Sequence, residues 1–108
     1  MNPEAFAALA HELRLRAFRL LVGVAPDGLP AGQIAMRLGV PASTLSTHLA
    51  QLERASLIKS SRERQRILYS IDAKGTQALV GFLINDCCGG QPELCGLVAR
   101  SRRTAKRA

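Results

Sequence analysis

Membrane spans and disulfide frameworks leave marks that this 108-residue sequence lacks. No apolar run reaches the roughly 20 residues of a membrane-spanning helix, and no basic N-terminal segment precedes a hydrophobic one. Aromatic residues make up only 4%, and the three cysteines are too few and too clustered for a secreted disulfide scaffold. We therefore expect one small, soluble, cytoplasmic domain, whose cysteines serve metal, metalloid or redox chemistry.

The sequence also has few acidic residues: there are 8, against 15 basic residues, and the net charge is +7. Such a balance favours a polyanionic partner. Five of the positive charges lie in residues 100–108, so the rest of the chain has 10 basic and 8 acidic residues, a net charge of only +2. More informative is the segment 59–66, which has four basic residues and one acid.

The first part of the chain has the periodicity of helices. Asn2 to Val22 keeps apolar residues at a 3.6-residue period, and His11-Glu12 is a possible break that the period alone leaves open. Residues 23–30 form a turn that contains Pro26-Asp27-Gly28. A short helix over Gly32 to Leu38 then ends at Gly39.

The segment from Val40 to Leu57 organises the rest of the chain. Leu45, Leu49 and Leu52 mark one buried helix face, and Pro41 opens the helix with Ser43 as a cap or first-turn donor. Short hydrogen-bonding side chains fill the other positions, as in helices that enter a DNA major groove. The predicted DNA contacts of this helix are Ser43, Thr44, Ser46, Thr47, His48 and Gln51. A solvated polar face is the alternative, and His48 lies beside the leucines, where it packs or touches a phosphate.

A basic β-hairpin is expected next, with strands Leu57 to Ser61 and Arg66 to Ile71 joined by Arg62 to Gln65. Arg62, Arg64 and Arg66 are predicted to neutralise phosphates, although charges on a strand edge also prevent aggregation. Two helices followed by a basic hairpin predict a winged helix-turn-helix, a mainly α fold with a β-hairpin wing.

A last helix follows Asp72, which could cap it, and carries an apolar stripe at Ala78, Leu79, Phe82 and Leu83. Helices at both ends of so small a domain either close its core or pair across a two-fold axis. We expect a homodimer, because helices that read DNA usually work on paired half-sites. The predicted organisation is a winged helix-turn-helix domain over residues 1–97, with dimerisation helices at both ends, and a basic disordered tail over residues 98–108.

The run LGVPASTLSTHLAQLERASLIKSSRERQRILYSI, residues 38–71, resembles the core of the ArsR/SmtB family of dimeric winged-helix repressors. ELRLRAFRLL, residues 12–21, resembles the second helix of that family, and the likeness extends from Phe6 to Cys95. The resemblance implies a repressor released by a metal or metalloid, paired through its first and last helices. Three family features are missing: residues 31–33 hold no Cys-Val-Cys site, residues 73–86 have no His for a zinc site, and Ala42 replaces a longer polar side chain.

Three cysteines follow the last predicted helix in INDCCGGQPELC, residues 84–95. Cys87 and Cys88 are adjacent, and a chain that reverses over Gly-Gly-x-Pro can bring Cys95 back to them. Three thiolates suit a soft acceptor such as As(III) or Sb(III), whereas zinc would need a fourth ligand from Asp86 or Glu93. The segment is similar to the C-terminal Cys-Cys-Gly-Gly-x-Pro-Glu-x-Cys form of arsenic-sensing family members.

These features predict a repressor that binds double-stranded operator DNA and is released by As(III) or Sb(III) bound to the three cysteines. One alternative is a redox-sensing regulator that forms a Cys88–Cys95 or inter-subunit disulfide, and another is that the cysteines are inert. A basic protein that binds DNA without sequence preference is a further alternative. A thiol enzyme is disfavoured, because the chain has neither a C-x-x-C motif nor a phosphate loop beside a cysteine.

Overall fold

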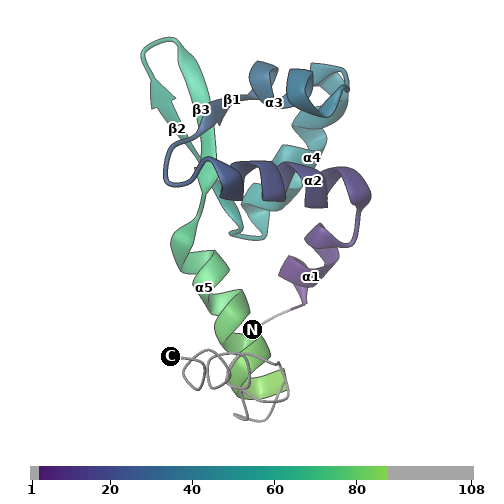
Figure 1. Cartoon of the computed structure of the whole chain (residues 1–108), viewed down its shortest axis with the longest axis vertical. Coiled ribbons are helices and arrows are strands. Elements are labelled where there is room, and N and C mark those ends of the chain that lie inside the picture. Colours follow the sequence, from purple (N-terminus) through teal and green to yellow (C-terminus); the bar gives the residue numbers. More distant parts are fainter. Residues whose placement is uncertain (1–2, 88–108) are drawn as a thin grey trace, which may run out of the picture. The chain divides into compact units, whose positions relative to one another are not determined.

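A computed structural model of the chain describes residues 3–87, which divide between two compact units (Figure 1). The first unit ends at Thr76, and the second begins at Gln77. The helices are α1 Glu4–Leu9, α2 Glu12–Gly23, α3 Ala31–Leu38, α4 Ala42–Arg54 and α5 Ala73–Gly81, and the strands are β1 Leu29–Pro30, β2 Ile58–Glu63 and β3 Arg66–Ile71. A π-helix, Phe82–Cys87, follows α5. None of the helices in this part of the chain is long and apolar enough to cross a membrane.

The first predicted helix is divided in two, so a continuous helix from Asn2 to Val22 is wrong. His11 has an extended backbone (φ −134°, ψ 131°), and its Nδ1 accepts a hydrogen bond from the backbone N–H of Leu13 at 3.1 Å. This contact satisfies one of the donors at the start of α2, which no earlier carbonyl can reach. The possible break at His11-Glu12 is therefore confirmed.

The helix-turn-helix is formed by α3 and α4. Gly39 ends α3 in the left-handed region (φ 71°), as predicted. Pro41 precedes α4 with an extended backbone (φ −64°, ψ 146°), and its carbonyl accepts the N–H groups of Thr44 and Leu45. Ser43 is not the cap, because Pro41 occupies that position and no side chain caps the helix; Ser43 lies in the first turn of α4, the other position predicted for it.

Three antiparallel strands form a sheet in the order β1-β3-β2, and the hairpin extends away from the helices of its unit (Figure 1). The predicted hairpin is confirmed, but pairing continues to Glu63 and Arg66, so the turn is two residues rather than four. Arg64 occupies this turn with φ 59°. β1 is a strand that the sequence did not predict, and it pairs Leu29 with Tyr69.

The core of the first unit lies where α2, α3, α4 and the base of the hairpin meet. Its fully buried side chains are Leu21, Ile34, Leu45, Leu49, Leu52, Leu57 and Ile58. All three leucines of the predicted stripe on α4 are among them, which confirms the orientation assigned to that helix.

The start of α5 belongs to the first unit. The carboxylate of Asp72 accepts the N–H of Gly75 at 3.2 Å, so the predicted cap is confirmed. Asp72 is also tied to the hairpin base, because its N–H donates to the carbonyl of Leu57 at 3.1 Å. In the second unit the predicted stripe is only partly buried: Leu79 is buried and Phe82 half-buried, whereas Ala78 and Leu83 are exposed.

Candidate nucleic-acid interface

Helix α4 has two different faces. Leu45, Leu49 and Leu52 are 0% exposed, because the 3.6-residue period places them together against the core. The predicted contact residues Ser43, Thr44, Ser46 and Thr47 are all exposed. Gln51, one turn further on, is half-buried. The structure therefore places a run of hydroxyl groups on the solvent side of a helix whose other side is fixed.

One of these hydroxyls already has a local partner. Ser46 Oγ donates to the carbonyl oxygen of Ser43 at 3.2 Å, a bond to the preceding turn of the same helix. The oxygen keeps its lone pairs, so Ser46 still presents an acceptor to the solvent side.

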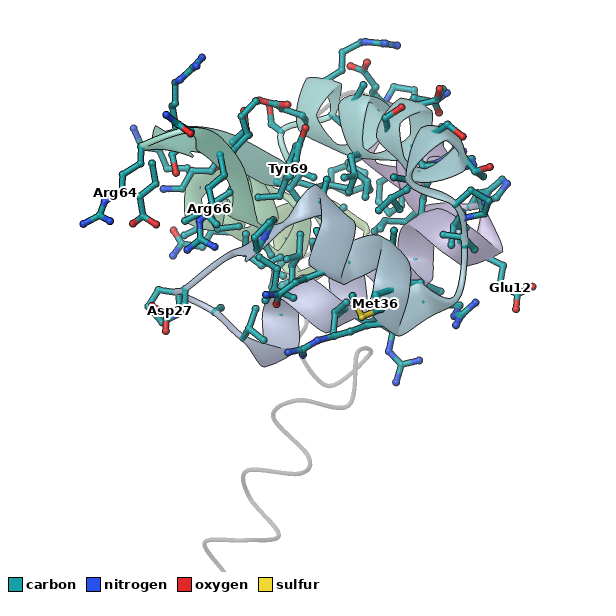
Figure 2. All side chains as sticks on the ribbon, turned by 90° about the horizontal axis from the view of Figure 1, so that it is seen from above. Glu12, Asp27, Met36, Arg64, Arg66 and Tyr69 are labelled. Atoms are coloured by element: carbon teal, nitrogen blue, oxygen red, sulfur yellow. The ribbon has the colours of Figure 1, made fainter. Side chains whose placement is uncertain are left out.

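The hairpin holds the three predicted arginines, and all are exposed. Figure 2 shows Arg64 projecting outward from the hairpin end, away from the body of the unit. Arg66 differs, since its guanidinium lies 3.4 Å from the carboxylate of Glu63. Exposed ion pairs of this kind contribute little stability, but the carboxylate offsets part of the charge of Arg66. Arg62 and Arg64 thus carry the less compensated positive charge of the wing.

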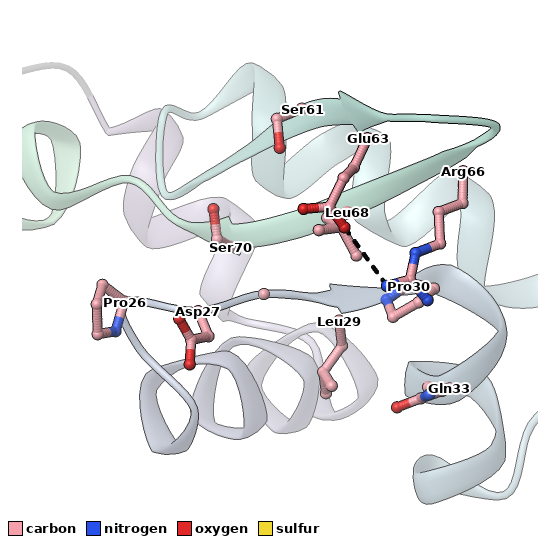
Figure 3. Close-up of a pocket in the computed structure, with 11 residues that line it drawn as sticks. Pro26, Asp27, Leu29, Pro30, Gln33, Ser61, Glu63, Arg66, Leu68 and Ser70 are labelled. Carbon is pink, nitrogen blue, oxygen red and sulfur yellow. Dashed lines mark hydrogen bonds and ion pairs between the residues drawn. The ribbon is translucent and has the colours of Figure 1, made fainter.

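A pocket of about 440 Å³ lies between the loop before β1, α3 and the hairpin (Figure 3). Its polar lining includes Asp27 and Gln33 on one side and the Glu63–Arg66 pair on the other. Two carboxylates and one guanidinium do not make a site for an anion. The pocket therefore adds nothing to the predicted phosphate contacts of the wing.

His48 occupies a half-buried position on α4 among residues that the sequence did not connect to it. Its ring lies against that of His11, with centroids 4.4 Å apart and planes inclined by 39°. The guanidinium of Arg14 lies 3.3 Å from His48 Nδ1. Burial lowers the pKa of His48, and the charges of His11 and Arg14 lower this pKa further. The lowered pKa favours the neutral form of the packed His48 ring; a phosphate contact by this residue stays a prediction.

Comparisons with known proteins agree with this arrangement. A family model described as a helix-turn-helix domain matches residues 9–61. The HTH-type transcriptional regulator YgaV of Escherichia coli K12 is 38% identical over 81 residues, which cover 75% of this chain and 80% of the relative. The transcriptional activator HlyU of Vibrio cholerae is 32% identical over 76 residues, covering 70% of this chain and 68% of HlyU. The chain belongs to the winged helix-turn-helix transcriptional regulators.

Solved structures of other regulators share the winged helix-turn-helix fold of this chain. The structure of reduced HlyU from Vibrio cholerae matches with a TM-score of 0.60 and 30% identity, covering 75% of this chain and 82% of that one. The homodimeric winged helix-turn-helix DNA-binding domain Mb0332 from Mycobacterium bovis, described as a possible ArsR-family regulator, matches with a TM-score of 0.61 and 28% identity. This match covers 77% of both chains.

In the regulator, α4 is the second helix of the helix-turn-helix, which is the element that lies in the major groove in this class of fold. The hairpin is the wing. The structure brings the predicted residues of α4 and of the wing into one compact unit, but which of them contact DNA stays a prediction.

Most of the predicted cysteine site lies outside the residues that the structure describes. Cys87 is the last residue of the π-helix, whereas Cys88 and Cys95 lie outside the described residues. The donor set itself, three thiols within nine residues, fits a soft thiophilic ion.

Two arginines of α2 contact other helices in ways that the sequence does not predict. Arg14 contacts α1 and His48, and Arg16 Nη2 donates to the carbonyl of Leu38 at 3.4 Å, near the end of α3. A cation near a helix C-terminus is favourable, because the last carbonyls there have no partner within the helix. Neither contact follows from a local pattern, because each joins residues on separate helices.

Proposed function

We propose that the regulator is a metalloid-responsive repressor: it binds operator DNA as a homodimer and releases it when As(III) or Sb(III) binds Cys87, Cys88 and Cys95. The observation that carries this proposal is the clustering of all three cysteines in nine residues that start at the end of the last helix. The rest of the chain contributes no thiol, so a thiol-dependent response must come from this segment.

The chemistry of the donors favours a trivalent metalloid over zinc. Thiolates select soft ions, and As(III) or Sb(III) is satisfied by three sulfurs. Zinc in a protein takes four ligands in a tetrahedron. Asp86 or Glu93 would have to supply the fourth, and a carboxylate is a harder ligand than the thiolates around it. Each thiol would replace one hydroxide of As(OH)3 or Sb(OH)3, and its proton would leave with that hydroxide as water, so three thiols release three waters and no net proton.

The DNA-binding half of the proposal uses the exposed hydroxyls of α4 for the groove and the wing arginines for the phosphates. The homodimeric state of the similar domain Mb0332 supports pairing of two such units. A two-fold dimer would place its two α4 helices on half-sites about one turn of DNA apart. The operator is therefore expected to be a palindrome or near-palindrome.

Release of DNA by the inducer is a linkage effect. If the liganded state holds the two α4 helices in a spacing that fits DNA less well, operator affinity falls by the coupling free energy, typically about 1–3 kcal/mol or 5- to 150-fold. By reciprocity, bound operator must weaken metalloid binding by the same factor.

The experiment begins with selection of preferred duplexes from a random-sequence library by the wild-type protein. Fluorescence anisotropy then follows the complex as arsenite or antimonite is added. We expect release from the wild type, and loss of release in Cys87→Ser, Cys88→Ser and Cys95→Ser, with unchanged DNA affinity before addition. Normal release by all three single variants would contradict the three-sulfur site.

A thiol redox sensor is the second candidate, supported by the description of the similar HlyU structure as its reduced form. Here a peroxide would accept two electrons as the Cys88 and Cys95 thiols join in a disulfide, and their two protons leave with the reduced oxygens as two waters. This function predicts release by hydrogen peroxide, reversal by dithiothreitol and no response to arsenite.

A further inference from the structure

Arg14 of α2 contacts two other helices at once. Its Nε donates to the carbonyl of Ala8 at 2.7 Å, and its Nη2 donates to the carbonyl of Ala7 at 3.4 Å. Both carbonyls belong to the last turn of α1, and that of Ala7 also accepts the N–H of Ala10 at 3.2 Å. The remaining arm, Nη1, lies 3.3 Å from His48 Nδ1 on α4. One partly buried guanidinium thus joins α1, α2 and α4.

His11 closes the same cluster from the other side. It caps α2 through the N–H of Leu13, and its ring lies against that of His48. The side chains of His11 and Arg14, at the corner between α1 and α2, therefore both contact α4 at His48. That residue is directly next to Thr47 and two positions from Ser46, both on the exposed hydroxyl face.

We propose that Arg14 is a positioning residue for DNA recognition, which sets the orientation of the hydroxyl face of α4 through His48 without contacting DNA. The guanidinium suits this role because its five donors form a rigid planar fork that can bond several acceptors at once. A lysine ammonium on a flexible stem would bond one of these acceptors and leave the others without a donor.

The protonation state of His48 agrees with this role. In the neutral tautomer that carries its proton on Nε2, His48 Nδ1 accepts from the Arg14 donor, whereas a protonated ring would turn a second donor toward it. Burial lowers the pKa of His48 most, and the titratable groups that face it, His11 and Arg14, lower this pKa further. The contact therefore holds the neutral ring and is lost on acidification.

The test compares Arg14→Ala and Arg14→Lys with the control Arg19→Ala. Arg19 is an exposed arginine on the same helix, so the control removes the same charge. The probes are a duplex selected by the wild-type protein from a random library and a scrambled duplex of equal composition, at a temperature where far-UV circular dichroism shows each variant folded.

We expect Arg14→Ala to reduce affinity for the selected duplex by about tenfold, within the range typical of coupled neighbours. Affinity for the scrambled duplex should stay within about twofold, since phosphate contacts carry nonspecific binding. Arg19→Ala should change both affinities equally. Arg14→Lys keeps the charge but not the planar fork, so its affinity for the selected duplex is expected to lie between those of the wild type and Arg14→Ala. Because the charge is unchanged, this loss would be one of contact geometry.

An independent readout is the pKa of His48, followed by NMR of its ring. This pKa should rise in Arg14→Ala, because the positive charge of Arg14 that lowers it is removed. It should stay constant in Arg19→Ala. A folded Arg14→Ala with the wild-type ratio of selected to scrambled affinity would overturn the proposal. If Arg14→Ala does not fold, a wild-type ratio in Arg14→Lys has the same meaning.

Discussion

Gly75 lies where the first turn of α5 meets the chain just after α4. A Cβ at Gly75 would overlap the carbonyl oxygen of Ser56 and lie 2.7 Å from its carbonyl carbon and 3.0 Å from its Cβ. Ser56 has a left-handed backbone (φ 64°), and the adjacent Leu57 is held by the hydrogen bond from Asp72. The colliding atoms are therefore backbone atoms on a constrained turn, and no flexible side chain can move aside.

We expect Gly75→Ala to lower the free energy of unfolding by about 1–3 kcal/mol, the usual cost of overpacking a filled site. In a helix without such a neighbour the same change would be stabilising by up to about 1 kcal/mol. A decrease in the free energy of unfolding on Gly75→Ala would therefore show that the added Cβ collides with Ser56, and an increase would show that it does not. The melting temperature should fall by about 4–8 °C for each kcal/mol in a domain of this size.

The assay is urea and thermal unfolding followed by far-UV circular dichroism. Gly32→Ala is the matched control, because a Cβ at Gly32 of α3 would meet nothing within 4 Å. This control should be neutral or slightly stabilising. A Gly75→Ala variant that unfolds at or above the wild-type midpoint would refute the close packing of α5 on the turn after α4.

Four further predictions follow from single residues. Leu49→Ala should destabilise the protein by about 2–5 kcal/mol in urea unfolding, because Leu49 is 0% exposed. Gly39→Ala should cost about 1–2 kcal/mol in the same assay, since Gly39 has φ 71°; no loss would contradict the left-handed turn. Arg64→Ala should reduce the slope of log affinity against log salt by about 0.9 for each wing that binds a phosphate, about 1.8 for the dimer, and an unchanged slope would exclude that contact. The free energy of unfolding should rise with pH up to the ordinary His pKa of 6.5. Between the lowered pKa of His48 in the folded protein and this value, the unfolded chain binds more protons than the folded one. His48→Asn should flatten this rise, and an unaltered pH profile in that variant would contradict the lowered pKa.

The parts of the fold that could be predicted are those with a repeated local signal. The leucines of α4 recur at helical spacing because one face of the helix is completely buried, and Gly39 ends α3 because it adopts a positive φ easily. The hairpin was predictable from its alternation and its basic turn. Asp72 was predictable as a cap from its position before a new apolar period.

The missed features depend on distant residues or on signals too short to read. Histidine is not among the preferred helix caps, so the sequence alone does not decide whether the helix breaks at His11. β1 has two residues, one of them proline, which is too short for an alternating pattern. The link from Arg14 to His48 joins positions 34 residues apart and exists only after the helices pack. The cysteine site stays a prediction, since two of its three residues lie outside the described part of the chain.

The most direct test of the proposed response is X-ray absorption at the arsenic edge on the full-length protein loaded with one equivalent of arsenite per protomer. We expect a first shell of three sulfur atoms around each arsenic and no oxygen. A first shell that contains oxygen, or arsenic that washes out of the protein, would contradict it.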